Sequence, residues 1–214
     1  MKLATVVVCA LILSATSAMA QRYEFGGGVG VGFYTNQDIK NGDTSVKAKF
    51  KSNLATSVWF AQNARNHWGG ELRYSYQRGA ASLDGQGQQT SFGAETHSIA
   101  YDFLWHTNER DSPVRPYLAF GGGLKIYRGT GTEVLYQPLQ QYGLLTKTQG
   151  LYGMVSVGAG VKFKLTPHWQ LRFDVHDYIS PFPKKVIQPA LGASVGGWMN
   201  DIVPMVGIAY TSDN

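Results

Sequence analysis

The stretch YEFGGGVGVGFY, which runs from Tyr23 to Tyr34, alternates apolar residues with glycine or polar ones over most of its length. Successive side chains of a β-strand point to opposite faces, so one face of this segment is apolar and the other is small or polar. Glycine weakens strands in ordinary sheets, but inside a narrow barrel small residues make room for large side chains from other strands. The segment therefore predicts a barrel strand with an apolar outer face.

Seven further segments of the chain show the same period of two. They are Phe50–Gln62, Trp68–Arg78, Gly93–Trp105, Arg115–Tyr127, Leu151–Leu165, Trp169–Tyr178 and Asp201–Thr211. Each is close to the roughly 9–11 residues that a tilted strand needs to cross a membrane. Soluble β-sandwiches alternate in the same way, so the alternation alone does not distinguish a sandwich from a membrane barrel. The connections between the segments provide the distinction.

These connections alternate between long and short. The long ones are residues 35–49, 79–92, 128–150 and 179–200, and the short ones are 63–67, 106–114 and 166–168. Outer-membrane barrels combine short periplasmic turns with longer external loops, and an even strand number leaves both termini in the periplasm. We therefore expect four longer external loops, with the termini on the periplasmic side.

Large aromatic residues gather beside the predicted short turns. Trp68, Trp105, Trp169 and Tyr210 all lie at this end of their segments, as an interfacial aromatic girdle requires. Trp59 also lies there but has the inward parity of its segment, so it is either a lumen residue or the sign of a bulge. Because lipid offers no partner for backbone polar groups, strands can span it only as a closed ring. The prediction is an all-β fold, an eight-stranded antiparallel up-and-down transmembrane β-barrel.

The first residues predict export. Lys2, an apolar stretch from Leu3 to Leu13 and small residues up to Ala20 indicate a signal peptide over residues 1–20, leaving a barrel domain over residues 21–214. The lone cysteine, Cys9, falls inside the signal peptide, so we expect neither disulfides nor a thiolate metal site. Charged residues make up 15%, below the usual quarter, and the net charge of +5 is mild, so nucleic-acid binding is not expected.

A family resemblance rests on two features. The run LTPHWQLRFD, from Leu165 to Asp174, resembles the strand–turn–strand signature of small OmpA-like outer-membrane barrels, and the glycine-alternating runs are similar to their strands. The resemblance implies an integral barrel of the OmpA/OmpX/OmpW kind in the bacterial outer membrane. Such barrels commonly end on an aromatic residue, whereas Tyr210 is followed by four more residues here. No peptidoglycan-binding domain is expected after the barrel, so a role in cell-wall anchoring is not predicted.

Charged side chains with inward parity form the candidate site. This lumen ionic network comprises Glu24, Glu71, Arg73, Asp102, Lys125, Lys162, Lys164, Arg172, Asp174 and His176. Eight strands enclose a space that side chains just fill, and an unpaired buried charge costs several kcal/mol. We therefore favour a structural plug over an ion conduit. We expect Arg73 and Arg172 to pair with Glu71, Asp102 or Asp174.

Catalytic and metal readings have weaker support. His97 and Ser98 suggest a base and a nucleophile for lipid deacylation, but adjacent strand residues point to opposite faces. No nucleophile motif such as GxSxG occurs, and the histidines lack metal-binding spacing. We expect no enzyme activity, no metal and no cofactor.

The loops suggest contact surfaces. Residues 128–150 and 179–200 carry aromatic and aliphatic side chains that would suit an unknown surface ligand, or that pack on the barrel rim. Lys184 and Lys185 would suit the phosphates of outer-membrane lipid and lipopolysaccharide. The favoured role is structural or surface-interacting, through envelope stability, adhesion or ligand contact, in a chain that is expected to be monomeric. The alternatives are a narrow small-solute channel and a lipid-modifying enzyme.

Overall fold

The computed structural model describes residues 22–51 and 53–212, and their regular structure consists of β-strands. Residues 1–20, which we predict to be a signal peptide, lie outside this part of the chain. No helix in the described part is long and apolar enough to cross a membrane.

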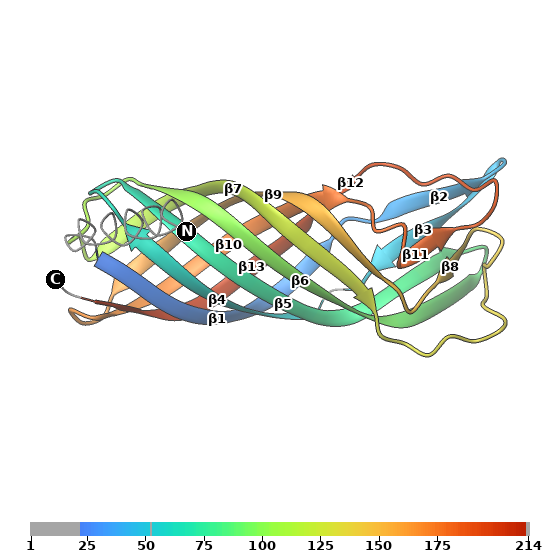
Figure 1. Cartoon of the computed structure of the whole chain (residues 1–214), viewed down its shortest axis with the longest axis horizontal. Helices are drawn as coiled ribbons and strands as arrows, with labels where there is room; N and C mark the ends of the chain where they lie inside the picture. The colour runs from blue at the N-terminus through green and yellow to red at the C-terminus, as the bar shows by residue number, and fades with distance from the viewer. Residues whose placement is uncertain (1–21, 52, 213–214) are drawn as a thin grey trace, which may run out of the picture.

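Eight long strands close into an antiparallel ring (Figure 1). They are β1 (Arg22–Tyr34), β4 (Asn53–Asn63), β5 (Trp68–Gly85), β6 (Gln88–His106), β7 (Val114–Gly129), β9 (Gln149–Lys164), β10 (Trp169–Pro181) and β13 (Asp201–Thr211). Each pairs with the next along the chain, and the ring closes where β1 pairs with β13, for example at Phe25 and Tyr210. The predicted eight-stranded up-and-down barrel is confirmed.

The wall of this barrel is apolar outside and polar inside. Phe25, Phe103 and Leu124 are each at least half exposed, as in a surface that faces hydrocarbon rather than water. Small residues line much of the interior and leave space for the large inward side chains. Closure of the ring satisfies the backbone hydrogen bonds that lipid cannot satisfy. The alternating sequence pattern therefore corresponds to the two faces of the wall.

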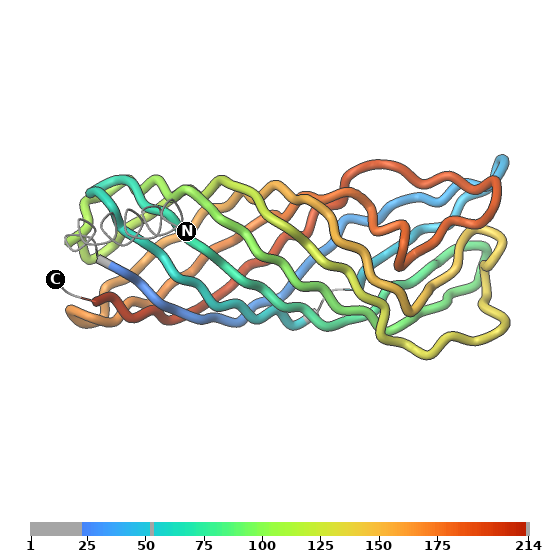
Figure 2. Tube along the Cα trace, viewed as in Figure 1, coloured from blue at the N-terminus to red at the C-terminus, as the bar shows by residue number. Residues whose placement is uncertain are grey.

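The chain extends beyond the barrel at the end opposite to the termini (Figure 2), and this extension contains five short strands. The short strands are β2 (Gln37–Asn41), β3 (Thr44–Phe50), β8 (Gly143–Leu145), β11 (Ile187–Pro189) and β12 (Trp198–Met199). We call residues 35–50, 79–94, 129–149 and 182–200 the cap. Most of the largest buried apolar cluster of the described chain lies in the cap and includes Ile39, Leu83, Tyr142 and Val186. The cap therefore has a packed core of its own.

Much of the cap corresponds to segments that the sequence pattern placed in loops. Residues 79–92 are not a loop, because β5 and β6 stay paired as far as Gly85 and Gln88. A two-residue turn at Gln86 and Gly87 joins them, and both residues have the positive φ angles that match the twist of a tight hairpin. Phe50 belongs to β3 and pairs with Ala81 rather than beginning a barrel strand.

Trp59 lies inside the barrel, where two glycines on neighbouring strands leave space for its ring. The register between β1 and β4 runs without interruption from Arg22 to Gly32, so there is no bulge beside Trp59. A Cβ added at Gly26 would lie 2.5 Å from the Trp59 ring, and one at Gly207 would lie equally close. Glycine at these two positions therefore makes room for the indole.

Replacing Gly26 with valine is expected to destabilise the barrel by about 1–3 kcal/mol, the usual cost of overpacking a tight interior. The added atoms would collide with Trp59, which is 2% exposed and has little room to move. Urea unfolding in lipid vesicles, followed by the gel shift between folded and unfolded chain, measures the effect. Gly153→Val is the matched control, because a Cβ at Gly153 meets no atom within 4 Å. Equal loss of stability in both variants would contradict the packing argument.

Candidate functional site in the charged lumen

Two arginines form the centre of the lumen. Arg73 Nε donates to Glu71 Oε1 over 2.9 Å, and Arg73 Nη2 lies 3.1 Å from Asp174 Oδ2. Arg172 Nε donates to the same Asp174 oxygen over 2.7 Å, and its Nη1 donates to Glu71. Arg172 Nη1 also lies 3.5 Å from Glu24. Each guanidinium therefore bridges two or more carboxylates that come from different strands.

The Trp59 ring contacts both of these guanidinium groups. The Cζ atoms of Arg73 and Arg172 are 5.0 and 4.8 Å from its centroid, within the range of cation–π attraction. The indole nitrogen donates to Glu24 Oε1 over 3.1 Å. Tyr117 accepts from Arg172 Nε over 2.7 Å. Aromatic rings therefore fill the space that the ionic groups leave.

Lys162, Asp102 and His176 extend this centre along the barrel. Lys162 Nζ donates to Glu24 Oε2 over 2.6 Å. The Asp102 carboxylate accepts from Ser156 Oγ over 3.2 Å, and His176 Nε2 lies 3.6 Å from the same oxygen. Asp102 thus contacts a hydroxyl and an imidazole, while the two central arginines bind Glu71 and Asp174.

A second polar group lies toward the cap. Lys125 Nζ donates to Asp201, whose Oδ2 also accepts from Gln77 Nε2 over 2.7 Å. Three tyrosine rings surround the ammonium group: Tyr34, Tyr127 and Tyr178 lie 4.9, 5.2 and 5.8 Å from it. This pair separates the arginine centre from the apolar core of the cap.

Charge is balanced throughout the described lumen. The buried carboxylates belong to Glu24, Glu71, Asp102, Asp174 and Asp201, and the buried lysine and arginine side chains to Arg73, Arg115, Lys125, Lys162 and Arg172. A buried charge without a partner costs several kcal/mol, so this matching is what allows so many ionised groups inside a narrow barrel. These ion pairs link side chains from different strands across the lumen.

One residue of the expected network lies elsewhere. Lys164 has inward parity, but it is exposed at the terminus-bearing rim because it is the last residue of β9. It lines a small cavity there together with Arg115. No ion pair joins Lys164 to the network among the described residues, so its inclusion was wrong.

Sequence reasoning also missed several members of the lumen. Asp201 shares inward parity with Met205 and Gly207, and that parity was the signal that would have found it. Tyr117 and Gln77 carry the same signal within their strands. Tyr117 and Gln77 carry no formal charge and were therefore left out of the expected network, although hydroxyl, amide and indole groups all bond to its charged side chains.

The described residues hold no group of three or more His, Cys, Asp or Glu side chains arranged for a metal ion. His97 is half-buried on the outer wall, whereas Ser98 is buried in the lumen. The two side chains therefore lie on opposite sides of the wall, as adjacent strand residues must. Direct proton transfer between them is excluded by this geometry.

The closed ring of strands with an apolar outer wall agrees with what a comparison with known proteins shows. The model of a family described as the outer membrane protein beta-barrel domain matches residues 6–184. This chain belongs to that outer-membrane β-barrel family. The fold and the family together place it among the barrels of bacterial outer membranes.

Solved structures show the same fold for this outer-membrane barrel. The outer membrane protein OprG of Pseudomonas aeruginosa matches with a TM-score of 0.64 at 15% identity, over 91% of this chain and 97% of that one. Neisserial surface protein A matches with a TM-score of 0.52 at 12% identity, over 88% and 96%. No curated protein matches by sequence.

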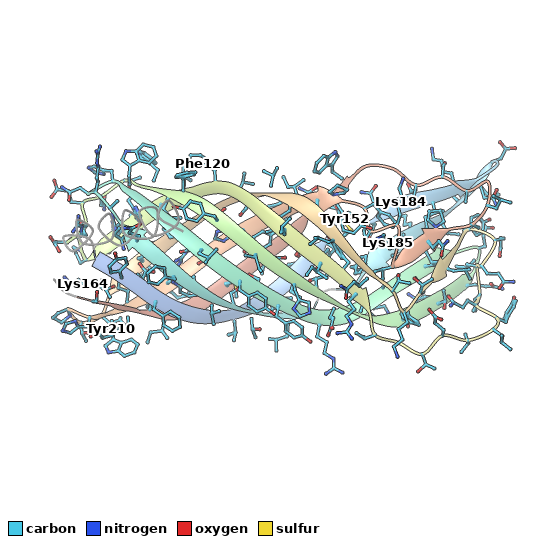
Figure 3. All side chains as sticks on the ribbon, in the orientation of Figure 1. Phe120, Tyr152, Lys164, Lys184, Lys185 and Tyr210 are labelled. Carbon is cyan, nitrogen blue, oxygen red and sulfur yellow. The ribbon has the colours of Figure 1, made fainter. Side chains whose placement is uncertain are left out.

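The aromatic residues expected to form a girdle lie together at the end of this outer-membrane barrel that bears the termini. Trp68 pairs with Trp105 across β5 and β6, and Trp169 pairs with Tyr210 across β10 and β13. All four are between 38% and 49% exposed, and Figure 3 labels Tyr210 near the C-terminal end of the barrel. Indole and phenol groups at this depth suit a membrane–water interface, because they are apolar with one polar atom.

Proposed function

We propose that this barrel has a structural or surface-interaction role, in which a closed lumen anchors the cap on the outer face of the membrane. The observation that carries the proposal is the paired plug around Arg172. Each ionised side chain in the centre is satisfied by another, which favours cohesion of the wall over binding of a mobile ion.

The space left in the lumen supports a closed barrel. The cavity at the terminus-bearing rim, lined by Arg115, Lys162 and Lys164 among others, has a volume of about 20 Å³. A second cavity beside Tyr34 and Gln77 has about 10 Å³. Each has room for about one water molecule. The main alternative, a narrow small-solute channel, would require the paired side chains of the lumen to move apart.

The orientation follows from the lengths of the connections. The terminus-bearing end has short turns, which are typical of the periplasmic side, and the opposite end carries the cap. In the cap, Leu135 and Leu191 are fully exposed and Trp198 is 59% exposed. Exposed apolar side chains on a packed support are suited to contact with another molecule. We therefore place the termini in the periplasm and the contact surface outside.

Cysteine labelling of intact cells tests this orientation. Leu191→Cys is expected to react with a membrane-impermeant maleimide on intact cells, because its side chain is fully exposed in the cap. Glu109→Cys, in a turn at the other end, is expected to react only after the outer membrane is permeabilised. The parent chain controls for Cys9, which we expect to be removed with residues 1–20. The reverse labelling pattern would refute the orientation.

Recordings in planar lipid bilayers test closure. The purified barrel is expected to give no discrete openings, because the paired plug and the cap core fill its interior. Reproducible unitary currents that vanish with a buried-charge variant such as Lys125→Met would favour the channel instead. The lipid-modifying alternative predicts altered lipid A on expression, which mass spectrometry of extracted lipid measures; we expect the lipid to be unchanged.

A further inference from the structure

The outer wall of β5, β6, β7 and β9 changes character over three successive rungs just below the cap. From the membrane toward the cap, the outward residues of these strands are Tyr74, Ile99, Leu124 and Gly153, then Tyr76, His97, Ile126 and Leu151, then Arg78, Glu95, Arg128 and Gln149. The rungs therefore become more polar toward the cap: the first carries one phenol, the second a phenol and an imidazole, and the third three charged side chains and an amide. This is the order of chemistry that an amphiphile presents along its length.

The charged rung is organised around one carboxylate. Glu95 accepts from Arg128 Nη1 over 3.2 Å and from the Tyr76 hydroxyl over 3.2 Å. His97 Nε2 lies 3.7 Å from Glu95, and its Nδ1 lies 2.8 Å from the Tyr74 hydroxyl. Arg128 is positioned by these contacts, yet its side chain is 56% exposed and has donors to spare. With Arg78 opposite Glu95, the rung carries a net positive charge.

An apolar groove of about 300 Å³ lies directly below this rung. Ile99, Leu124, Ile126 and Leu151 line it, and Arg128 and Gln149 close its upper end. Gly153 faces outward opposite Leu124, and a Cβ there would meet nothing within 4 Å. Because Gly153 has no side chain, the outer wall is hollow at this point beside the groove.

Further positive charge lies above the groove. The Thr148 hydroxyl donates to the Lys185 carbonyl over 2.5 Å, which holds the Lys184–Lys185 segment beside the start of β9. Both lysines are exposed, and Figure 3 shows them next to each other just beyond the barrel wall. Gln149, the residue after Thr148, pairs with Arg128. The cations at this level therefore extend from β5 to β9.

We propose that this face binds a phosphorylated glycolipid of the outer leaflet, with an acyl chain in the groove and phosphates on Arg78, Arg128 and the two lysines. Neighbouring strands are about 4.8 Å apart, so Arg78 and Arg128, two strands apart, are separated by roughly 10 Å along the wall. A headgroup with more than one phosphate engages cations spread in this way, whereas a phospholipid with one phosphate engages a single site. The inference rests on the proposed orientation, which places this rung in the outer leaflet.

Native mass spectrometry of the detergent-purified barrel, titrated with bis-phosphorylated lipid A, tests the proposal. Arg78→Gln with Arg128→Gln is expected to weaken binding about 30-fold, since each basic residue at a membrane surface contributes a factor of roughly five. Gly153→Leu is expected to weaken it with the charges intact, by filling the hollow beside the groove. Arg65→Gln, at an exposed turn on the opposite end, is the matched control. The gel shift on heating shows that each variant is folded.

Three further results decide between explanations. Weaker binding of monophosphoryl lipid A and of phosphatidylglycerol to the parent barrel supports a site for several phosphates. Equal affinity for lipid A and phosphatidylglycerol, or an unchanged affinity in the double arginine variant, would overturn it. Bilayer recordings and cysteine labelling are independent of these arginines. Failure of the lipid site therefore leaves the proposed closed barrel standing, and unitary currents would remove that role without removing the lipid site.

Discussion

Arg172→Met is expected to lower the free energy of unfolding by about 3–5 kcal/mol, the cost of leaving buried carboxylates without their partner. Arg172 contacts Glu71, Asp174 and Glu24, and its side chain is fully buried. Methionine retains much of the volume but none of the donors. Glu71 and Asp174 would then keep Arg73 alone among the central cations.

Urea titration in lipid vesicles, with folding followed by gel mobility and tryptophan emission, measures this loss. Lys164→Met is the matched control, because Lys164 is exposed at the rim and outside the network. It is expected to change stability by less than about 0.5 kcal/mol. The double variant Arg172→Met with Glu71→Gln is expected to recover part of the loss, since it restores equal numbers of buried acidic and basic side chains in the lumen. Equal stability of Arg172→Met and Lys164→Met would refute the role of the plug in cohesion.

Trp59→Ala is expected to destabilise the barrel by about 3–5 kcal/mol, the usual cost of truncating a large buried aromatic residue. The indole fills the space beside Gly26 and Gly207 and contacts two guanidinium groups. Gly26 and Gly207 have no side chains that could fill the space left by the indole, so a cavity remains. Arg73 and Arg172 would also lose their cation–π contacts with the ring.

A smaller substitution separates packing from hydrogen bonding at the same position. Trp59→Phe keeps most of the ring and loses the donor to Glu24, so it is expected to cost about 1–3 kcal/mol. Trp169→Ala, an exposed girdle residue, serves as the control for loss of an indole as such. The same urea titration applies. If Trp169→Ala lowered the free energy of unfolding as much as Trp59→Ala, burial in the lumen would not explain the loss of stability.

Sequence alone was sufficient for the barrel because its two faces differ at every second residue. In β1, for example, glycines alternate with Val29, Val31 and Phe33, and the alternating long and short connections favoured a membrane barrel over a soluble sandwich. The cap lacked such a pattern. Residues 79–92 contain glycine, serine and glutamine, which are typical of loops, yet pairing with β6 and burial of Leu83 hold them as strand.

The expected pairing of Arg73 and Arg172 with Glu71 or Asp174 agrees with the ion pairs of the structure, but the exact set of partners was not predictable. Parity placed Arg73 and Arg172 in the lumen, but which carboxylate each one binds depends on the stagger between strands far apart in sequence. Asp102 illustrates the limit, because parity made it a candidate partner for either arginine and the structure places it beside Ser156 and His176. For Lys164 the prediction of membership itself failed. It is the last residue of β9, where inward parity no longer places a side chain inside the barrel.

The seam between β1 and β13 joins the earliest and latest strands of the described chain, and this has a consequence for biogenesis. The ring cannot close until β13 is present. Until β1 and β13 pair, the edges of both strands keep backbone groups without partners, and such edges promote aggregation. Such long-range closure is slow compared with hairpin formation. We therefore expect a dependence on chaperones that shield open edges between translation and insertion.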